Sequence, residues 1–459
     1  MAVWSEIYCS EIVSEIRADS EFYAPKYEEL KFTLKAQKNI DALGKLSNTV
    51  KKGIFDISPT RYKDSGIPLI RTFQIKTPIV NEDNLVFINE TDHLREFCKT
   101  ELLSGDIVFT KIGAGIGDVG ILPKKYAKYN FSQNVAGSSI KREKINPYFL
   151  IAFLNSRYGR MQIHRYMMPS GQGKLELRDI KKIAIPRFSD VEIEIARMME
   201  LSESKSQLSQ SLYTQAQQLL ERELGLDKLV FDKPLSYEAR LSEVVGNNRA
   251  DADYYQTRYK QLRSNISGNR TGIQRLIDFA IVLKPNIDPS KSPSSEFKYV
   301  ELADINPTLG IINNANTFLG KELPSRARRV VTKGDVIASS VVGSVDKAAL
   351  VDETNDGCLA STGFFHFRPK KNIKSEFLLL LVRSRCVTMQ LQQESTGGIL
   401  SAVPDQRLRN VIIPNIDLSI QNKIAALVCQ SHKNFNQSKQ LLEQAKRRVE
   451  ELIEQAVQK

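Results

Sequence analysis

The 459-residue sequence has few cysteines and histidines, and none is placed to bind a metal or to build a disulfide framework. The five cysteines are Cys9, Cys98, Cys358, Cys386 and Cys429. Their number is odd, and no Cys-x-x-Cys pair occurs. The four histidines are dispersed, and we expect His93 and His432 at the surface. Because structural metal sites and disulfide frameworks require clustered or evenly paired residues, the sequence predicts neither.

Long apolar runs are also missing. No segment approaches the ~18–20 uninterrupted apolar residues of a membrane-spanning helix. The first residues, Met1 to Glu6, have neither the basic flank nor the apolar run of a signal peptide. Hydrophobic residues make up 41% of the chain and charged residues 26%, which is typical of globular proteins. We therefore expect a cytoplasmic protein with no membrane association.

Catalytic motifs are absent or incomplete. Gly115-x-Gly117-x-x-Gly120 matches the dinucleotide-binding pattern, but that pattern requires a helix to begin at the glycines. The following residues, 121–125, predict an extended segment, so the glycines indicate a hairpin or tight turn. Asn146-Pro147-Tyr148-Phe149 is similar to the Asn-Pro-Pro-Tyr loop of amino-methyltransferases, but it lacks the second proline, and a helix N-terminus explains it better. We expect no enzymatic activity, no metal and no bound cofactor.

Positive charge is what the chain has in excess. Its 65 lysines and arginines exceed its 53 acidic residues and give a formal net charge of +12. Such a balance indicates an anionic partner, and nucleic acid is favoured because phosphate contacts release counterions. Simple solubility is the alternative. The basic residues divide almost evenly between the two halves, which favours two similar binding surfaces over one basic tail.

The sequence also repeats. The segment Arg17-Ala18-Asp19-Ser20-Glu21-Phe22-Tyr23 returns 232 residues later as Arg249-Ala250-Asp251-Ala252-Asp253-Tyr254-Tyr255. Further landmarks recur in the same order, at offsets of 228 or 229: Leu103–Val108 with Thr332–Ile337, Ser156-Arg157 with Ser384-Arg385, Met161-Gln162 with Met389-Gln390, and Ile183–Pro186 with Val411–Pro414. Solenoid repeats have periods of roughly 20–50 residues, so duplicated whole domains fit this spacing better.

Each half predicts a mixed α+β domain. Short apolar runs such as Ile67–Ile70 and Asp106–Phe109, broken by Gly, Asn and Asp, indicate strands. A helix is predicted at Pro147–Leu154, where proline stands at the helix start, with its counterpart at Ser375–Leu381. A further helix is predicted around Tyr23–Lys35.

Each half ends in a long polar segment with a seven-residue spacing of apolar residues. In residues 191–224 the predicted seam consists of Leu201, Leu208 and Gln215 in one series, and of Lys205, Leu212 and Leu219 in the other. In residues 418–457 the two series are Phe435, Leu442, Val449 and Ala456, and Ser431, Ser438, Ala445 and Leu452. Such seams predict a coiled coil. We favour pairing of the two helices with each other over two lone surface helices.

Basic and amide side chains that flank the predicted strands are the candidate DNA-binding residues. Arginine can bridge guanine O6 and N7, and Gln or Asn can bridge adenine N6 and N7. A dense arginine cluster more often touches phosphates. The candidates are Arg61, Lys63, Arg71, Gln74, Lys111, Gln133, Asn134 and Lys174 in the first half, and Arg326, Arg328 and Arg329 in the second. For each of them a solvated surface side chain is the alternative.

In this combination the chain resembles the specificity subunit of Type I restriction–modification systems. The resemblance is carried by the Gly-Asp steps at Gly105 and Gly334, the glycine-containing turns Gly171-Gln172-Gly173 and Gly397-Gly398, the prolines Pro186 and Pro414 before each long helix, and Ile420-Gln421 in the second helix. It implies two tandem α+β target-recognition domains, residues 1–188 and 227–416. Each is followed by a spacer helix, residues 189–226 and 417–459, and the helices pair as an antiparallel coiled coil in a pseudo-two-fold internal repeat.

The resemblance also implies a function. The protein would be a non-catalytic, sequence-specific DNA-binding subunit that recognises a bipartite, asymmetric site in double-stranded DNA. It would direct adenine-methyltransferase subunits, two of them, and ATP-dependent restriction subunits to that site, as a phage-defence system. S-adenosylmethionine and ATP would bind those partners and not this chain. The family pattern assigns no role to the Arg-Ala-Asp segments, which we expect to dock the domain against the helix pair or against a partner.

Three other hypotheses remain open from the sequence. One is a DNA-recognition module of another phage-defence complex with the same architecture. A second is a methyltransferase with fused recognition domains, which the missing methyl-donor loop argues against. The third is a methyltransferase-associated or other protein scaffold whose basic charge is incidental.

Overall fold

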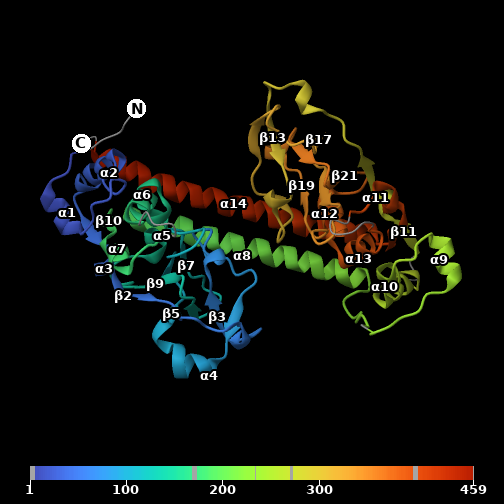
Figure 1. The fold of residues 1–459 in the computed structure, drawn as a ribbon, viewed down its shortest axis with the longest axis horizontal. Helices are drawn as coiled ribbons and strands as arrows, with labels where there is room; N and C mark the ends of the chain where they lie inside the picture. The colour runs from blue at the N-terminus through green and yellow to red at the C-terminus, as the bar shows by residue number, and fades with distance from the viewer. Residues whose placement is uncertain (1–5, 168–172, 233, 269–271, 396–401, 458–459) are drawn as a thin grey trace. The chain divides into compact units, whose positions relative to one another are not determined.

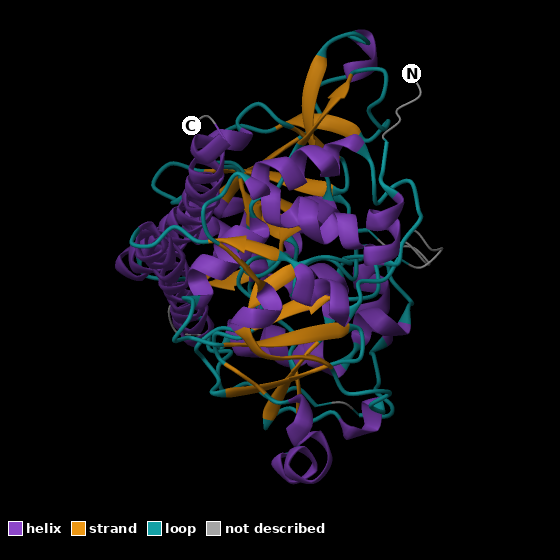
Figure 2. Ribbon diagram, turned by 90° about the vertical axis from the view of Figure 1, so that its left-hand side faces the viewer, coloured by secondary structure: helices purple, strands orange, loops and turns teal. Residues whose placement is uncertain are grey.

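The computed structural model describes residues 6–167, 173–232, 234–268, 272–395 and 402–457. The chain divides into two compact units: residues 1–206 with 436–459, and residues 207–435. Unit 1 and unit 2 are the names used for them below. The predicted glycine turns at 171–172 and 397–398 lie outside the described residues. Both units contain helices and strands, which confirms the predicted α+β class (Figure 1, Figure 2).

Unit 1 contains two four-stranded sheets and one strand pair. The first sheet has the order β2-β9-β6-β7 and the second has the order β4-β3-β8-β5, while β1 pairs with β10. The bounds are β1 Ile40–Ala42, β2 Ser47–Lys52, β3 Ile67–Ile70, β4 Val86–Ile88, β5 Leu102–Leu103, β6 Ile107–Thr110, β7 Val119–Ile121, β8 Lys128–Phe131, β9 Val135–Ile140 and β10 Ala184–Pro186. The β6–β7 pair is an antiparallel hairpin, and Gly117 between them has φ +83°, so the glycine motif is a turn, as predicted.

Helices cover these strands. They are α1 Cys9–Glu15, α2 Pro25–Lys35, α3 Leu43–Leu46, α4 Glu90–Asp92, α5 Pro147–Asn155, α6 Arg157–Tyr166 and α7 Leu177–Lys182, followed by the long α8 Val191–Glu223. At the start of α5 the side chain of Asn146 accepts a hydrogen bond from Tyr148 N at 2.9 Å, and Pro147 occupies the first turn. Every residue from Tyr148 to Leu154 is buried. The Asn-Pro-Tyr-Phe segment is therefore a capped core helix.

Unit 2 repeats this topology and adds two strands, β15 and β14, to the edge of its first sheet. Its sheets have the orders β12-β21-β18-β19-β15-β14 and β16-β13-β20-β17, and β11 pairs with β22. The bounds are β11 Ile273–Arg275, β12 Ala280–Leu283, β13 Glu296–Val300, β14 Ile305–Asn306, β15 Ile311–Ile312, β16 Asn316–Leu319, β17 Ala327–Val330, β18 Val336–Ser339, β19 Ala348–Leu350, β20 Leu359–Ser361, β21 Phe364–Pro369 and β22 Ile412–Pro414. The helices are α9 Leu241–Asn247, α10 Thr257–Ser267, α11 Leu276–Phe279, α12 Ser375–Arg383, α13 Arg385–Gln393 and α14 Leu418–Val457.

The repeated residues are those that fix the backbone. In unit 1 the amide of Gln162 donates to Ala184 O at 2.9 Å and accepts from Ala184 N at 2.8 Å, and this pair of bonds holds β10. In unit 2 Gln390 makes the same two bonds to Ile412 of β22, at 2.7 and 3.0 Å. Because each glutamine satisfies one N–H and one C=O of its strand, replacing it leaves those two backbone groups without a partner.

The Arg-Ala-Asp segments are a second repeated device. In unit 1 Arg17 pairs with Asp19 at 2.8 Å and lies 4.5 Å over the ring of Phe22, while Tyr23 donates to Arg17 O. Arg17 also donates to the carbonyl of Tyr166 at the end of α6, at 3.1 Å. The segment therefore docks onto its own domain.

Unit 2 repeats the internal contacts of this segment. Arg249 pairs with Asp251 at 2.6 Å and lies 4.7 Å over the ring of Tyr254, and Tyr255 donates to Arg249 O at 2.6 Å. The preceding helices, α1 and α9, both end at a residue with left-handed φ, Ile16 and Asn248.

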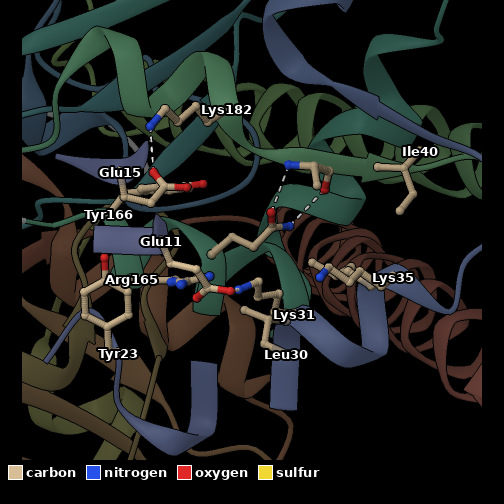
Figure 3. A pocket seen from close by; sticks show the side chains of 13 residues that line it. Glu11, Glu15, Tyr23, Leu30, Lys31, Lys35, Ile40, Arg165, Tyr166 and Lys182 are labelled. Carbon is tan, nitrogen blue, oxygen red and sulfur yellow. Dashed lines mark hydrogen bonds and ion pairs between the residues drawn. The ribbon is translucent and has the colours of Figure 1, made fainter. Parts of the chain in front are cut away.

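A pocket of about 380 Å³ lies beside the first of these segments, between α1, α2, α6 and α7 (Figure 3). Its charged side chains pair with one another. Lys31 donates to Glu11 at 2.9 Å and Lys182 donates to Glu15 at 2.7 Å. These two ion pairs join α1 to α2 and to α7. The pocket is therefore explained by the packing of α1 against its own domain.

The long helices α8 and α14 run antiparallel, and each contributes to both units. In unit 1 Ser202 donates to Ser438 O at 2.9 Å and Ser438 donates back to Ser202 O at 2.8 Å. In unit 2 Ser431 donates to Ser209 O at 2.7 Å. Along each helix the two serines are seven residues apart and occur in opposite order, as in an antiparallel coiled coil.

Four of the eight predicted seam residues of α14 are buried and the other four are half-buried, while Ile453, outside both predicted series, is buried. The predicted seam of α8 is wrong by one residue. On α14, Ser431, Ser438, Ala445 and Val449 are buried as predicted. On α8, Leu201 and Leu208 are 48% and 45% exposed. The buried positions are instead Ile195, Met199, Ser202, Ser209, Tyr213, Ala216 and Leu220. Serines at the seam let the backbones approach closely enough for hydroxyl-to-carbonyl bonds, and leucines there would hold them apart.

The surface position predicted for His93 is also wrong. Its side chain is buried, with Nε2 2.9 Å from Glu101 and Nδ1 2.6 Å from the Asn130 amide. His432 is half-buried in unit 2, where its ring stacks on Tyr213 and its Nε2 donates to Leu309 O at 2.8 Å. Burial lowers the pKa of His432. Both rings are satisfied by local hydrogen bonds.

Candidate nucleic-acid interface

Strand ends meet along one edge of unit 1. β3 and β8 are parallel and end at Ile70 and Phe131, and Ser132 N donates to Ile70 O at 2.9 Å. β6 ends opposite the start of β9, where Thr110 pairs with Val135. β2 ends at the same place, with Lys52 opposite Ala136. The residues that follow these strands therefore lie side by side, and we call them the strand-end edge.

Five of the predicted DNA-binding residues of the first half occupy the strand-end edge: Arg71, Lys111, Gln133, Asn134 and Lys174. Lys111 N donates to Asn134 O at 2.8 Å, and Ile112 bridges to Lys174. Gln133 is attached to the next loop, because its side chain accepts from Asp56 N at 3.3 Å. Up to 103 positions separate these residues in the sequence, from Arg71 to Lys174, and the sheet register brings them together.

Two residues of this edge escaped the sequence prediction. Lys52 ends β2 and is exposed. Phe55 follows it and is 84% exposed, although most large apolar side chains of the unit are buried. The loop that displays Phe55 is fixed: Ile54 N donates to Phe131 O at 2.8 Å. Gly53 permits this approach, because a Cβ there would lie 2.2 Å from Ser132 O. The sequence signal that could have identified Phe55 is the segment Gly53-Ile54-Phe55, which directly follows β2.

Of the remaining candidates of the first half, the side chains of Arg61 and Gln74 are held by protein partners, whereas Lys63 is exposed. Arg61 pairs with Asp92 at 3.1 Å and Glu96 at 2.7 Å, and these carboxylates raise its pKa. Gln74 is buried and its side chain accepts from Arg71 N at 2.9 Å, so it caps the short helix Thr72–Gln74. Lys63 exchanges backbone hydrogen bonds with Phe87.

Arg71 itself stays at the edge. Its guanidinium lies 4.5 Å over the ring of Phe73, which is partly exposed, and donates to Asn84 O at 2.9 Å. A planar guanidinium stacked on an aromatic face keeps its orientation, so Arg71 is held in place at this edge.

The arginine cluster of the second half separates in the structure. Arg326 is exposed, and its carbonyl accepts from Thr362 N at 2.8 Å. Arg328 pairs with Asp288 at 2.8 Å. Arg329 is buried and donates to Leu283 O at 2.6 Å, and burial lowers its pKa. Of the three, Arg326 is the one exposed beside the strand end of β20.

The equivalent edge of unit 2 carries different side chains. Register places Glu301 where unit 1 has Arg71, since Val300 and Ile70 occupy matching positions in the parallel pairs β13–β20 and β3–β8. The bridge between Val341 and Ala402 matches that between Ile112 and Lys174. Ser340 and Ala402 therefore stand in for Lys111 and Lys174. The scaffold is shared, and the chemistry at its edge is not.

Two absences can be stated for the described part of the chain. No helix there is long and apolar enough to cross a membrane. Nor do those residues contain a group of three or more His, Cys, Asp or Glu side chains placed to hold a metal ion.

Residues 42–193 match the family model described as "Type I restriction modification DNA specificity domain". No curated protein matches the sequence. Among solved structures, the chain is similar to the Type I restriction–modification S subunit from M. genitalium, with 12% identity over 91% of this chain and 95% of that one and a TM-score of 0.44. It is also similar to the HsdS subunit from Thermoanaerobacter tengcongensis, with 15% identity over 91% and 96% of the two chains and a TM-score of 0.29.

The family match covers the segment that contains both sheets of unit 1 and its strand-end edge. This match rests on the sequence of residues 42–193 and is independent of the structural similarities. This match confirms the resemblance inferred from the sequence landmarks: residues 42–193 carry the DNA specificity domain of Type I restriction–modification systems, a domain of DNA sequence recognition.

Proposed function

We propose that this protein recognises a bipartite, asymmetric site in double-stranded DNA. It would direct adenine-methyltransferase subunits and ATP-dependent restriction subunits to that site. The observation that carries the proposal is the specificity domain at residues 42–193 together with its topological repeat in unit 2. Each recognition domain, residues 1–188 and 227–416, reads one half-site. The spacer helices, residues 189–226 and 417–459, set the distance between them, and two methyltransferase subunits bind the assembly.

The difference between the strand-end edges supports an asymmetric target. Arg71 and Glu301 occupy equivalent positions with opposite charge. An arginine donates to guanine, whereas a glutamate accepts from the cytosine amino group, so such edges prefer different bases. The residues proposed to meet DNA are Lys52, Phe55, Arg71, Lys111, Gln133, Asn134 and Lys174 in unit 1 and Arg326 in unit 2. The chain itself would be non-catalytic, with S-adenosylmethionine and ATP bound by its partners.

Duplex binding and its salt dependence test the proposal. We expect the purified chain to bind a mixed-sequence DNA duplex with a logarithmic binding constant that falls steeply as salt rises, because several phosphates are neutralised. Fluorescence anisotropy over a salt series measures this. Mapping methylated adenines in the source genome then gives the target. A flat salt response, or methylation with no two-part motif that depends on this gene, would contradict the proposal.

A substitution of Phe55 tests the edge more directly. We expect F55A to weaken binding to the mapped target by about 1–2 kcal/mol, which is comparable to the free energy gained by burying one apolar side chain in an interface. The slope of affinity against salt should stay unchanged, since Phe55 carries no charge. F32A is the matched control, because Phe32 is 69% exposed on α2, away from the strand ends. Equal losses for F55A and F32A would remove Phe55 from the interface.

A further inference from the structure

We propose that Lys111, flanked by Lys52 and Lys174, forms a phosphate clamp in unit 1 that grips the DNA backbone at one half-site. The inference rests on the proposed function and specifies which chemical group of DNA this place binds. It goes beyond the choice of basic residues as candidates, because it assigns a single anion site to three lysines and predicts that the other unit lacks it.

Three separate pieces of chain bring the lysines together. Lys111 follows β6 and Lys52 ends β2, and both strands pair with β9. Lys174 lies on the segment that returns to bridge Ile112, and the next residue, Leu175, donates from its N–H to Lys111 O at 3.1 Å. Because the backbone of each lysine is held by strand or bridge hydrogen bonds, all three side chains start from fixed positions on the sheet edge.

Lys111 is buried without a counter-ion. Lys111 is only 6% exposed. No described residue forms a hydrogen bond or ion pair with its ammonium group. The carboxylate in the cluster, Glu176, is 2.7 Å from Lys174 and so is already engaged. A lysine that is largely buried and whose ammonium has no carboxylate partner is stabilised when an anion binds beside it. The three lysines therefore favour a ligand of negative charge at this place.

The electrostatics of the cluster agree with the geometry. Burial lowers the pKa of Lys111, and the positive charges of Lys52 and Lys174 lower it further. Glu176 acts in the opposite direction on Lys111, and its own pKa is lowered mainly by its hydrogen bond with Lys174. A phosphate placed among the three ammonium groups would relieve this repulsion and form charge-assisted hydrogen bonds.

The clamp belongs to unit 1. The bridge at Val341–Ala402 puts Ser340 and Ala402 at the places of Lys111 and Lys174. Neither side chain carries charge, and only the place of Lys52 keeps a lysine, Lys284, which follows β12. Unit 2 therefore lacks the central lysine and one of its two flanking lysines. We expect the two half-sites to be held unequally, with more salt-sensitive contacts at the one read by unit 1.

The test is K111M in the full chain, a substitution of similar length without the charge. Loss of one phosphate contact should reduce the slope of log affinity against log salt by about 0.9, and weaken binding to a mixed-sequence duplex about eightfold at about 0.1 M salt. At the same time K111M should unfold at a higher urea concentration than the wild type, because a buried unpaired charge is removed. K111R should retain most of the salt slope.

K45M is the matched control, since Lys45 is exposed in α3 at the opposite end of β2. It should change neither the slope nor the stability. Wild-type slope in K111M, or a slope that K45M lowers equally, would overturn the clamp while leaving DNA recognition intact. If the wild-type chain itself binds no duplex, the proposed function fails instead. A K111M variant that does not fold is replaced by K174M, for which the same loss of slope is expected.

Discussion

D335N is expected to destabilise unit 2 by about 3–5 kcal/mol, the cost of breaking a buried charged pair. Asp335 is buried at the start of β18, and its carboxylate is a hub. It accepts from Thr332 N at 3.0 Å, from His366 Nε2 at 2.7 Å and from Arg368 Nε at 2.8 Å. An asparagine has one acceptor oxygen in place of two and turns an N–H₂ group toward donors. Amide hydrogen exchange of peptides from β18 and β21 measures the loss.

The equivalent aspartate of unit 1 is the control. Asp106 accepts from Leu103 N at 2.9 Å and Ile140 N at 3.1 Å, and its nearest cation, Arg142, is 3.8 Å away. D106N should therefore cost about 1–2 kcal/mol, the penalty for one unsatisfied buried donor. Equal effects of the two substitutions would show that the His366 and Arg368 contacts contribute nothing to stability.

The two aspartates should also respond oppositely to acid. Burial opposes ionisation of Asp335, but hydrogen bonds from His366, Arg368 and Thr332 outweigh it and hold the pKa below its ordinary value. The stability it contributes is present above the unfolded-state pKa of about 3.9 and is lost as the pH falls through the lower folded-state pKa. The cost of D335N should therefore shrink in that acidic window.

For Asp106, burial raises the pKa, only partly offset by its backbone hydrogen bonds. Its linkage has the other sign: the contribution is present below about pH 3.9 and is lost as the pH rises through the higher folded-state pKa. The cost of D106N should therefore grow as the pH is lowered from neutrality toward 4. Parallel pH profiles for the two variants would contradict the opposite shifts.

The second large effect is expected at the helix seam. S202L and S209L together should destabilise the chain by about 2–6 kcal/mol, since each forces extra volume into a close-packed contact and removes a hydroxyl that bonds across the seam. Ser202 and Ser209 are both fully buried against α14. Urea unfolding followed by circular dichroism at a helix-sensitive wavelength measures the change.

L201S with L208S is the matched pair of substitutions one residue away. Because both leucines are about half exposed, we expect a change of less than about 0.5 kcal/mol in the free energy of unfolding. If the leucine substitutions proved more damaging than the serine ones, the seam would be the one predicted from the sequence, and the register seen in the structure would be wrong.

Much of the fold could be predicted because the repeat and its landmarks are properties of the chain alone. Gly105 and Gly334 recur since each has positive φ at a strand start, and Gln162 and Gln390 recur since each holds a strand. The register of α8 could not be predicted by looking for leucines. In α8 the leucines Leu201 and Leu208 are seven residues apart, and so are the serines Ser202 and Ser209. Only the contact with α14 decides that the serines face the seam.

The candidate site divides in the same way. By residue type alone, Lys111 and Gln74 are equal candidates for DNA binding. In the structure Lys111 is a cation at the strand-end edge without a hydrogen-bond or ion-pair partner among the described residues, whereas Gln74 is buried and caps a short helix. Phe55 was missed because an exposed phenylalanine looks, in sequence, like a core residue.

By itself the sequence determined the class of the protein: two α+β copies, a long helix after each, and a basic surface without catalytic motifs. These follow from periodicity, spacing and charge, which are local or additive properties of a chain. The tertiary structure decided which side chains share an edge, which charges are already neutralised and which face of α8 is buried. Those outcomes depend on sheet register and helix contact, because they join residues far apart in sequence.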